Sequence, residues 1–228
     1  MVKSFQLYNN FNIKSRHKKS ILLIGNFDGL HLGHQKLFSF ANKYKKKYSL
    51  KIGVLTFEPM PKMFFDKNLK NFRISNPQQK INLLKNLKVD FIIIKRFNKK
   101  FSKIKSTDFI KKSLANKLKA KFIFVSNNFR FGNKREGNVS QLIKFEKKYD
   151  YKIIKPKPLK LKNKIASSSM IRNFLEKGYL DKANKLLKRN WTVVGKVEKG
   201  RQLGKKIGFP TCNIDIKDYV IAKPGVYA

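Results

Sequence analysis

The sequence predicts an α/β protein in which a parallel sheet carries helices on both faces and is followed by the start of a smaller all-β unit. Three observations predict this fold. Short apolar runs suited to buried strands alternate with segments of helical periodicity up to about residue 189. Residues that open helices, such as Pro77 and Ser106, stand at the starts of helical segments. Beyond residue 189, glycine and proline become frequent, which is typical of turn-rich β structure.

Each element follows from its local pattern. The apolar run Ile21-Leu22-Leu23-Ile24 predicts a strand, and the glycine-containing turn after it leads into a helix. The run Phe91-Ile92-Ile93-Ile94 predicts another strand in the same way. The predicted strands are residues 20–27, 51–57, 91–97, 121–126 and 151–155, and the predicted helices are residues 33–48, 77–87, 107–118, 140–149, 169–177 and 180–188.

The expected domain organisation has two parts, residues 1–189 and residues 190–228. The second part opens with an alternating stretch at 191–197 that predicts a strand. In the first part, ligands of a parallel sheet bind beyond the carboxyl ends of its strands. The loops that should form the site are therefore residues 26–33, 57–65, 126–138 and 164–172.

The composition indicates a globular protein of a reducing compartment. Hydrophobic residues make up 41% of the 228 residues, enough to build a core. The single cysteine allows no intrachain disulfide, which favours the cytoplasm. The first ten residues carry no secretory signal, and the longest apolar runs are far shorter than the roughly 20 residues that span a bilayer. We therefore expect no membrane partner.

The chain is strongly basic, with 54 Lys and Arg against 13 Asp and Glu and a net charge of +41. Such a charge can mark a nucleic-acid or anionic surface. It can also reflect compositional drift toward lysine. The lysines run along the whole chain rather than gathering in one arm, and they far outnumber the arginines that reading base edges favours. Drift is the favoured interpretation, with weak non-specific nucleic-acid binding as a by-product.

The loop after the first predicted strand carries the chemistry. It reads GNFDGLHLGH from Gly25 to His34 and contains two of the three histidines. Glycines permit a tight turn, and the helix that starts near Gly33 offers unpaired N–H groups to a phosphate. The imidazoles of His31 and His34 can donate hydrogen bonds to phosphate oxygens while charge builds during transfer. The pattern predicts a nucleotide-binding, group-transfer loop.

These residues resemble the nucleotidyltransferase superfamily marked by the HxGH motif. More narrowly, the loop resembles the adenylyltransferase half of bacterial bifunctional riboflavin kinase/FMN adenylyltransferases. Four further segments are similar to motifs of that family and stand in its order. They are Thr56-Phe57-Glu58-Pro59 with Pro61 and Phe64-Phe65, Asn128-Phe129-Arg130-Phe131-Gly132, Ser167-Ser168-Ser169-Met170-Ile171-Arg172, and Gly208-Phe209-Pro210-Thr211-Cys212-Asn213.

The resemblance implies a Rossmann-like nucleotidyltransferase domain that transfers AMP from ATP to FMN and releases pyrophosphate. Mg²⁺ is expected mainly on the ATP phosphates. Asp28 is expected either to orient the loop or to hold Mg²⁺ through water. The implied catalytic residues are His31, His34, Asn128 and Arg172; the ATP-binding residues are Gly25, Asn26, Phe27, Asp28, Gly33, Ser167, Ser168 and Ser169; the flavin-binding residues are Phe57, Pro59, Phe64, Asn128, Arg130 and Phe131.

The resemblance also implies that residues 190–228 begin a β-barrel riboflavin kinase domain, with Thr211 and Asn213 in its Mg-ATP motif. We expect the full-length protein to phosphorylate riboflavin, and expect the 228-residue chain to lack that activity because the family's catalytic carboxylate lies further along. We also expect residues beyond about Gly200 to pack poorly.

Two alternative functions stay open. One is another adenylyl- or cytidylyltransferase with an HxGH motif, against which the TFEPMP and GFPTCN segments argue. The other is a basic RNA-binding protein on a retired nucleotidyltransferase fold, against which the intact HxGH and SSSMIR motifs argue. Outside these motifs, His17 is expected on the solvated surface, and Cys212 is expected to be small and partly buried.

Overall fold

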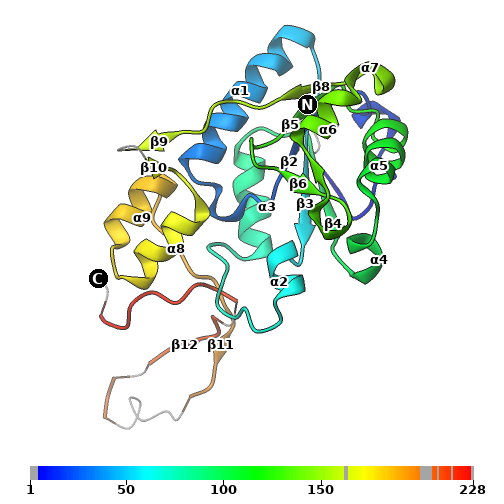
Figure 1. Cartoon of the computed structure of the whole chain (residues 1–228). Coiled ribbons are helices and arrows are strands. Elements are labelled where there is room, and N and C mark those ends of the chain that lie inside the picture. Colours follow the sequence, from blue (N-terminus) through cyan, green and yellow to red (C-terminus); the bar gives the residue numbers. More distant parts are fainter. Residues whose placement is uncertain (1–4, 162–163, 201–206, 210, 217, 227–228) are drawn as a thin grey trace.

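A six-stranded parallel sheet forms the centre of the molecule (Figure 1). The computed structural model describes residues 5–161, 164–200, 207–209, 211–216 and 218–226. Neighbouring strands are parallel throughout the sheet; for example, Leu23 pairs with Val54 on one side and Phe124 on the other. The strands lie in the order β1 (Gln6–Tyr8), β4 (Phe91–Arg96), β3 (Ile52–Glu58), β2 (Ile21–Ile24), β5 (Phe122–Phe124) and β8 (Lys152–Ile154).

Helices cover both faces of this sheet. On one face α1 (Leu32–Tyr48) and α3 (Pro77–Asn86) pack against it through side chains such as Phe38 and Leu84. On the other face lie α5 (Ser106–Asp108), its π-helical continuation η3 (Phe109–Lys117) and α6 (Val139–Lys144). The remaining helices are α2 (Pro61–Phe65), α4 (Lys99–Ser102), α7 (Glu146–Tyr149), α8 (Ser168–Glu176) and α9 (Leu180–Leu187), with short turns η1 (Ser15–His17), η2 (Asp28–Leu30) and η4 (Asn133–Arg135).

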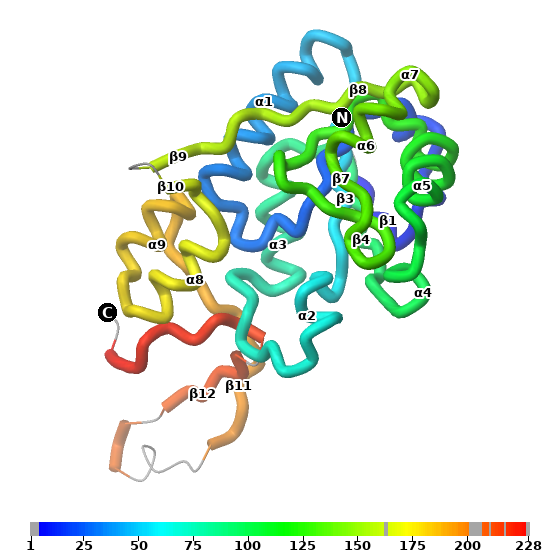
Figure 2. Tube along the Cα trace, in the orientation of Figure 1, coloured from blue at the N-terminus to red at the C-terminus, as the bar shows by residue number. Residues whose placement is uncertain are grey.

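The final part of the chain folds back onto the first. Helices α8 and α9 form a third apolar cluster with Ile74 and Val220, and Figure 2 shows the C-terminal segment, in red, passing beneath these two helices. Two-stranded pairs complete the secondary structure: β6 (Arg130–Phe131) with β7 (Gly137–Asn138), β9 (Lys160–Leu161) with β10 (Lys164–Ile165), and β11 (Val197–Glu198) with β12 (Asn213–Ile214). Among the described residues, no helix is both long and apolar enough to cross a membrane.

The structure confirms the predicted α/β architecture, including the five predicted strands and the helices between them. Two expectations for the later part of the chain are wrong. Within residues 191–197 only Val197 belongs to a strand, β11. Cys212 is exposed because it lies in a stretch that contacts no core cluster. Most of the described residues after Gly200 are exposed, as expected for poor packing, although Tyr219 and Val220 are buried. Residues 201–206 lie outside the described residues, and so does Pro210, which belongs to the GFPTCN motif. The domain boundary near residue 189 stays a prediction.

His17 is buried rather than solvated. Its Nδ1 lies 2.7 Å from the hydroxyl of Tyr8, and its ring stacks on Phe91 with centroids 4.6 Å apart. Burial, followed by the positive charge of Lys51, lowers the pKa of His17. The edge strand β1 explains the error: it brings Tyr8 beside β4 and covers a turn that looks polar in the sequence.

Candidate active site

The loop after β2 is tightly wound at the carboxyl edge of the sheet. Phe27, Gly29 and Leu30 all have positive φ angles, of 49°, 75° and 43°. A side chain on Gly29 would meet Ile74, whose Cγ2 lies 2.8 Å from the position of an added Cβ. The glycine therefore allows a close approach as well as the turn. The loop delivers the chain directly into helix α1 at Leu32.

His31 caps helix α1. Its Nδ1 accepts a hydrogen bond of 3.1 Å from the N–H of Gly33, so the proton of the neutral ring lies on Nε2. The ring of His34 stacks on it with centroids 3.8 Å apart. The Nδ1 of His34 is buried and has no hydrogen-bond partner among the described residues. Two imidazoles thus lie at the start of one helix, where the motif predicts them, and the structure shows that they are in contact. Each has a nitrogen left for a ligand.

Both histidines are uncharged at neutral pH in this state. Burial, with the nearby positive charge of Arg172 as second cause, lowers the pKa of His31 from 6.5 to about 4. Burial and then the neighbouring His31 hold the pKa of His34 well below its ordinary value. A triphosphate beside them would favour protonation, because nearby negative charge stabilises the imidazolium.

Asp28 is the structural centre of the loop. Its buried carboxylate accepts hydrogen bonds from the backbone N–H groups of Ile74 at 3.1 Å and Ser75 at 3.3 Å, and it pairs with Arg172 at 2.7 Å. These contacts favour the orienting role over the metal-binding one, since the oxygens are already committed. The described residues contain no group of three His, Cys, Asp or Glu side chains that could hold a metal ion.

Arg172 is largely committed as well. Its Nε donates to the carbonyl of Phe72 at 2.6 Å, and its guanidinium lies 3.6 Å from the centre of the Phe72 ring. Its charge faces Asp28 and acts on His31. The predicted direct contact with ATP phosphates therefore stays a prediction, whereas the structure gives Arg172 a clear role in holding the loop.

The serine segment stands at the start of helix α8. Ser167 caps the helix, since its Oγ accepts from the N–H of Met170 at 3.3 Å, and Ser168 donates to the carbonyl of Asp28 at 2.9 Å. Ser169 is exposed. A side chain on Gly33 would lie 3.2 Å from the carbonyl of Ala166, so the starts of α1 and α8 are adjacent. Two helix N-termini converge where the sequence predicts phosphate binding.

A large aromatic cavity opens beside this loop. It has a volume of about 800 Å³, within the range of cavities that hold small-molecule ligands. Phe129 and Phe131 stack inside it at 5.5 Å between centroids, and Phe57 faces Phe101 at 5.8 Å. Basic side chains and one acid stand around it. The other lining residues are Ile24, Gly25, Asn26, Pro61, Lys62, Phe65, Asp66, Phe97, Ser102, Ile104, Phe109, Ser126, Asn128, Arg130, Gly132, Lys134 and Arg135.

The predicted flavin residues divide into two groups. Phe57, Asn128, Arg130 and Phe131 line the cavity. Pro59 and Phe64 do not line it. The ring of Phe64 packs instead against the lining residue Phe97, with ring centroids 5.2 Å apart. Sequence reasoning missed lining residues that no motif contains, among them the apolar residues Phe97, Phe101, Ile104 and Phe109. Only the place of Phe97 at the end of a predicted strand was a signal for them.

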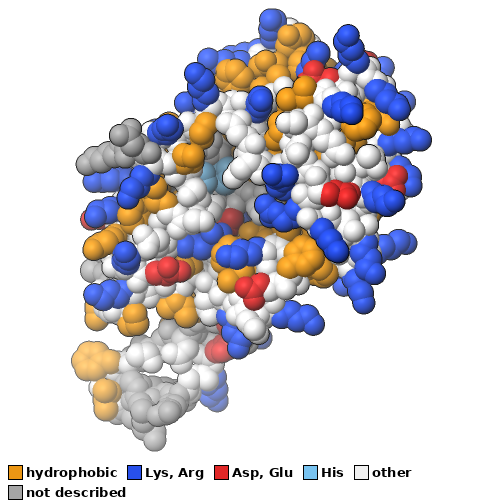
Figure 3. All heavy atoms as spheres, in the orientation of Figure 1, with side chains coloured by type: hydrophobic (Ala, Val, Ile, Leu, Met, Phe, Trp, Pro, Cys, Tyr) orange, Lys and Arg blue, Asp and Glu red, His pale blue; other side chains and the backbone are white. Residues whose placement is uncertain are grey.

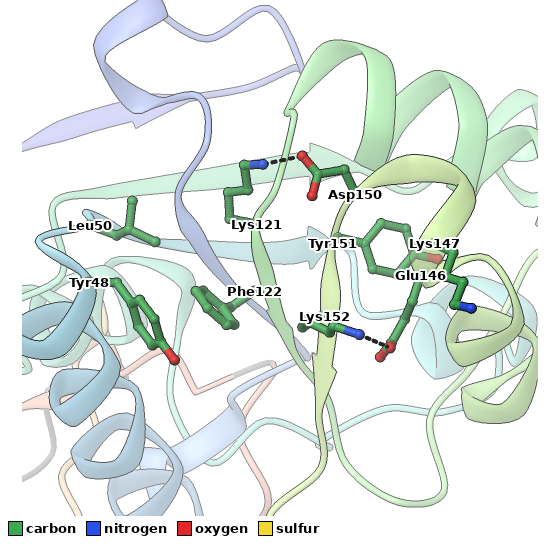
Figure 4. Close-up of a pocket in the computed structure, with 9 residues that line it drawn as sticks. All are labelled: Tyr48, Leu50, Lys121, Phe122, Glu146, Lys147, Asp150, Tyr151 and Lys152. Carbon is green, nitrogen blue, oxygen red and sulfur yellow. Dashed lines mark hydrogen bonds and ion pairs between the residues drawn. The ribbon is translucent and has the colours of Figure 1, made fainter.

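The surface around the site is open and basic. Figure 3 shows a recess near the middle of one face, with histidine and acidic side chains visible at its floor and lysines and arginines around it. A second, smaller hollow of about 390 Å³ lies at the opposite, amino-terminal ends of β5 and β8 (Figure 4). Four of its charged groups are paired with each other, Lys152 with Glu146 and Lys121 with Asp150. The carboxyl edge is therefore the candidate active site.

Comparison with known proteins agrees with this geometry. The family model described as FAD synthetase matches residues 13–170, and the model described as riboflavin kinase matches residues 187–228. A solved Streptococcus pneumoniae structure, named as a macrolide-efflux protein, has a TM-score of 0.82 and 28% identity and covers 98% of this chain and 73% of its own.

Curated relatives carry one name, bifunctional riboflavin kinase/FMN adenylyltransferase. The protein from Buchnera aphidicola of Schizaphis graminum is 40% identical over 95% of this chain and 70% of its own length. The Haemophilus influenzae protein is 35% identical over 91% of this chain and 67% of its own, and the Escherichia coli protein 33% identical over 91% and 66%. With family models matching most of its length and relatives of this identity, the chain belongs to the bifunctional riboflavin kinase/FMN adenylyltransferase family.

Proposed function

We propose that this chain transfers AMP from ATP to FMN, forming FAD and pyrophosphate. The observation that carries the proposal is the junction of two sites: Gly25 and Asn26 belong to the HxGH loop and also line the aromatic cavity. A flat aromatic ring system bound in the cavity would extend its phosphate toward the loop. The name shared by the curated relatives supports the same substrates.

In the proposed reaction an oxygen of the FMN phosphate attacks the α-phosphorus of ATP. The new P–O bond forms as the bond between the α-phosphorus and the bridging oxygen breaks, and pyrophosphate leaves with that electron pair. No covalent enzyme intermediate is needed. His31 donates from Nε2 and His34 acts beside it, stabilising charge on the phosphate oxygens at the start of α1. Ser167 to Ser169 and the N-terminus of α8 hold the remaining phosphates.

Basic side chains around the cavity suit the FMN phosphate. Arg130, Lys134 and Arg135 line the cavity from β6 and the turn after it, and Lys62 lines it from α2. Asn128 joins them with its amide, and its Oδ1 accepts from the Ser126 hydroxyl at 2.9 Å. Mg²⁺ is proposed to arrive on the ATP phosphates, since Asp28 is committed to Arg172 and backbone N–H groups. When bound there, Mg²⁺ would neutralise phosphate charge.

The match of residues 187–228 to the riboflavin kinase model supports the proposal that the full-length protein also phosphorylates riboflavin. Thr211 and Asn213 are its proposed Mg-ATP residues, and both are exposed. We also propose a cytoplasmic location, consistent with the free Cys212 thiol, and weak non-specific binding of nucleic acid through the net charge of +41.

Chromatography of flavins after incubation with FMN, ATP and Mg²⁺ tests the proposal. FAD and pyrophosphate should appear together in equal amounts. His34→Ala should lower kcat by about 10²–10³, as expected for a donor that acts mainly in the transition state, with FMN affinity little changed. Tyr48→Phe, at the far end of α1, is the matched control and should keep full activity. If FMN remains unchanged while another phosphate ester is adenylylated, the substrate assignment is wrong.

A further inference from the structure

Residues 72–76, which we call the bridging segment, connect the adenylyl-transfer loop to the part of the chain that matches riboflavin kinase. One side of the segment holds the loop. Ile74 and Ser75 donate backbone N–H groups to the carboxylate of Asp28, at 3.1 and 3.3 Å. The carbonyl of Phe72 accepts from Arg172, whose guanidinium pairs with the same carboxylate.

Residues after α9 hold the same bridging segment through other backbone groups. Arg73 donates its backbone N–H to the carbonyl of Asp218 and accepts from the N–H of Val220, both at 2.8 Å. The indole Nε1 of Trp191 donates to the carbonyl of Ile74 at 2.9 Å. The backbone groups of Arg73 therefore bind residues 218–220, while the N–H of the next residue, Ile74, binds Asp28.

Tyr219 fixes the end of the bridging segment. Its hydroxyl donates to Oε1 of Gln79 at 2.6 Å. The same Gln79 oxygen accepts from the N–H of Asn76 at 2.9 Å, as part of the capping box that starts α3. Tyr219 is 3% exposed, Val220 is 1% exposed and Ile74 is fully buried. The contact is therefore a packed interface, not a chance approach of surface groups.

The side chain of Arg73 extends the connection to the flavin side. It is buried and lies between two carboxylates, pairing with Glu58 at the end of β3 and lying 3.5 Å from Asp218 through Nε. Glu58 is the last residue of β3, and the short loop after it leads into α2, which lines the aromatic cavity. The residues after α9 thus reach both the phosphate loop and the flavin loop through one segment.

We propose that Trp191 and Tyr219 are positioning residues for adenylyl transfer, acting through the bridging segment and Asp28. The proposal rests on the proposed function. The adenylyl-transfer loop contains two non-glycine residues at positive φ, Phe27 and Leu30. Such a strained backbone persists only where the surrounding structure holds it in place. His31 follows Asp28 by three residues, so a shift of Asp28 would also move His31. The kinase-matched part of the chain therefore acts as part of the adenylyl-transfer site.

The test compares the full chain with Trp191→Phe and Tyr219→Phe, each of which keeps an aromatic ring and removes one donor. Tyr48→Phe is the control, because Tyr48 lies at the opposite edge of the sheet. For each protein we would measure kcat and KM for FMN at saturating Mg-ATP, and hydrogen exchange of the backbone in residues 26–34. Urea unfolding verifies that each variant is folded at the assay temperature.

We expect kcat to fall about fivefold to tenfold in both variants, the range that loss of one net hydrogen bond allows. KM for FMN should stay within about twofold, since neither residue lines the aromatic cavity. Residues 26–34 should exchange faster than in the parent and in Tyr48→Phe. Unchanged kcat and unchanged exchange in folded variants would overturn the inference. A parent that forms no FAD, with faster loop exchange in both variants, would refute the proposed function and leave the structural connection standing.

Discussion

Replacing His31 by asparagine removes a buried titratable group and keeps an oxygen that can cap helix α1. In the parent, Nδ1 of His31 accepts from the N–H of Gly33 at 3.1 Å. Asparagine is a strong capping residue, so its Oδ1 can take over that bond. The substitution therefore separates the cost of burying a titratable ring from the contribution of the cap. We expect the stability of parent and variant to be similar at pH 7.5 and to diverge in acid.

The sign and size of the difference follow from the pKa of His31, which burial and Arg172 lower from 6.5 to about 4. Above pH 6.5 the ring is neutral in both folded and unfolded chains. As the pH falls below 6.5 the unfolded chain takes up the proton first, and the folded state loses stability until about pH 4. At pH 5.0 this linkage amounts to about 2 kcal/mol of unfolding free energy for one such histidine.

Urea unfolding at fixed ionic strength, at pH 7.5 and pH 5.0, measures the effect. His31→Asn should lose about 2 kcal/mol less than the parent between the two pH values. The variant keeps some pH dependence because His17 and His34 also have lowered pKa values. Equal losses in both proteins would show that His31 takes up its proton as easily in the folded state as in the unfolded chain, and the stated burial effect would be wrong.

Three further predictions concern the loop, the cavity and the charge. Asp28→Asn should lower the free energy of unfolding by about 3–5 kcal/mol in urea, because it leaves the buried Arg172 guanidinium without its counter-charge; a loss below about 1 kcal/mol would contradict this. Phe65→Ala should weaken FMN binding about threefold to tenfold in a flavin-fluorescence titration, with little change in stability since Phe65 is 65% exposed. RNA affinity should fall at least about a hundredfold between roughly 50 and 200 mM salt, without sequence preference; a salt-insensitive, sequence-selective complex would favour a dedicated RNA-binding role.

The sequence predicts the sheet and the phosphate loop well because both depend on local patterns. Apolar runs such as Ile21–Ile24 have few alternatives to a buried strand, and the HxGH loop brings strand, turn and helix start together within ten residues. The edge strand β1 is only three residues long and gives no comparable signal. Missing it also led to the wrong prediction for His17, whose burial depends on Tyr8 and Phe91.

The aromatic cavity and the role of Arg172 depend on contacts between distant parts of the chain. Phe101 and Phe129 meet other rings only after β4, α4 and the β6–β7 pair have taken their places. An arginine such as Arg172 is a side chain that commonly binds phosphate, but its partner Asp28 lies 144 positions earlier in the chain. No local pattern reports such a partner, so the sequence predicts the charge and not its use. The same reasoning explains the burial of Tyr219, which is held by Gln79.

Because Trp191 is hydrogen-bonded to Ile74, its fluorescence should report on the state of the adenylyl-transfer loop. Trp191 is the only tryptophan in the chain, so all indole emission comes from one place, and that place touches the segment that holds Asp28. Occupation of the phosphate loop can therefore be followed without a label, by the wavelength and intensity of a single emitter. A flavin absorbs in the region where tryptophan emits, so arrival of the second substrate should quench the same signal. One native side chain thereby allows the order of substrate binding to be timed in a rapid-mixing experiment.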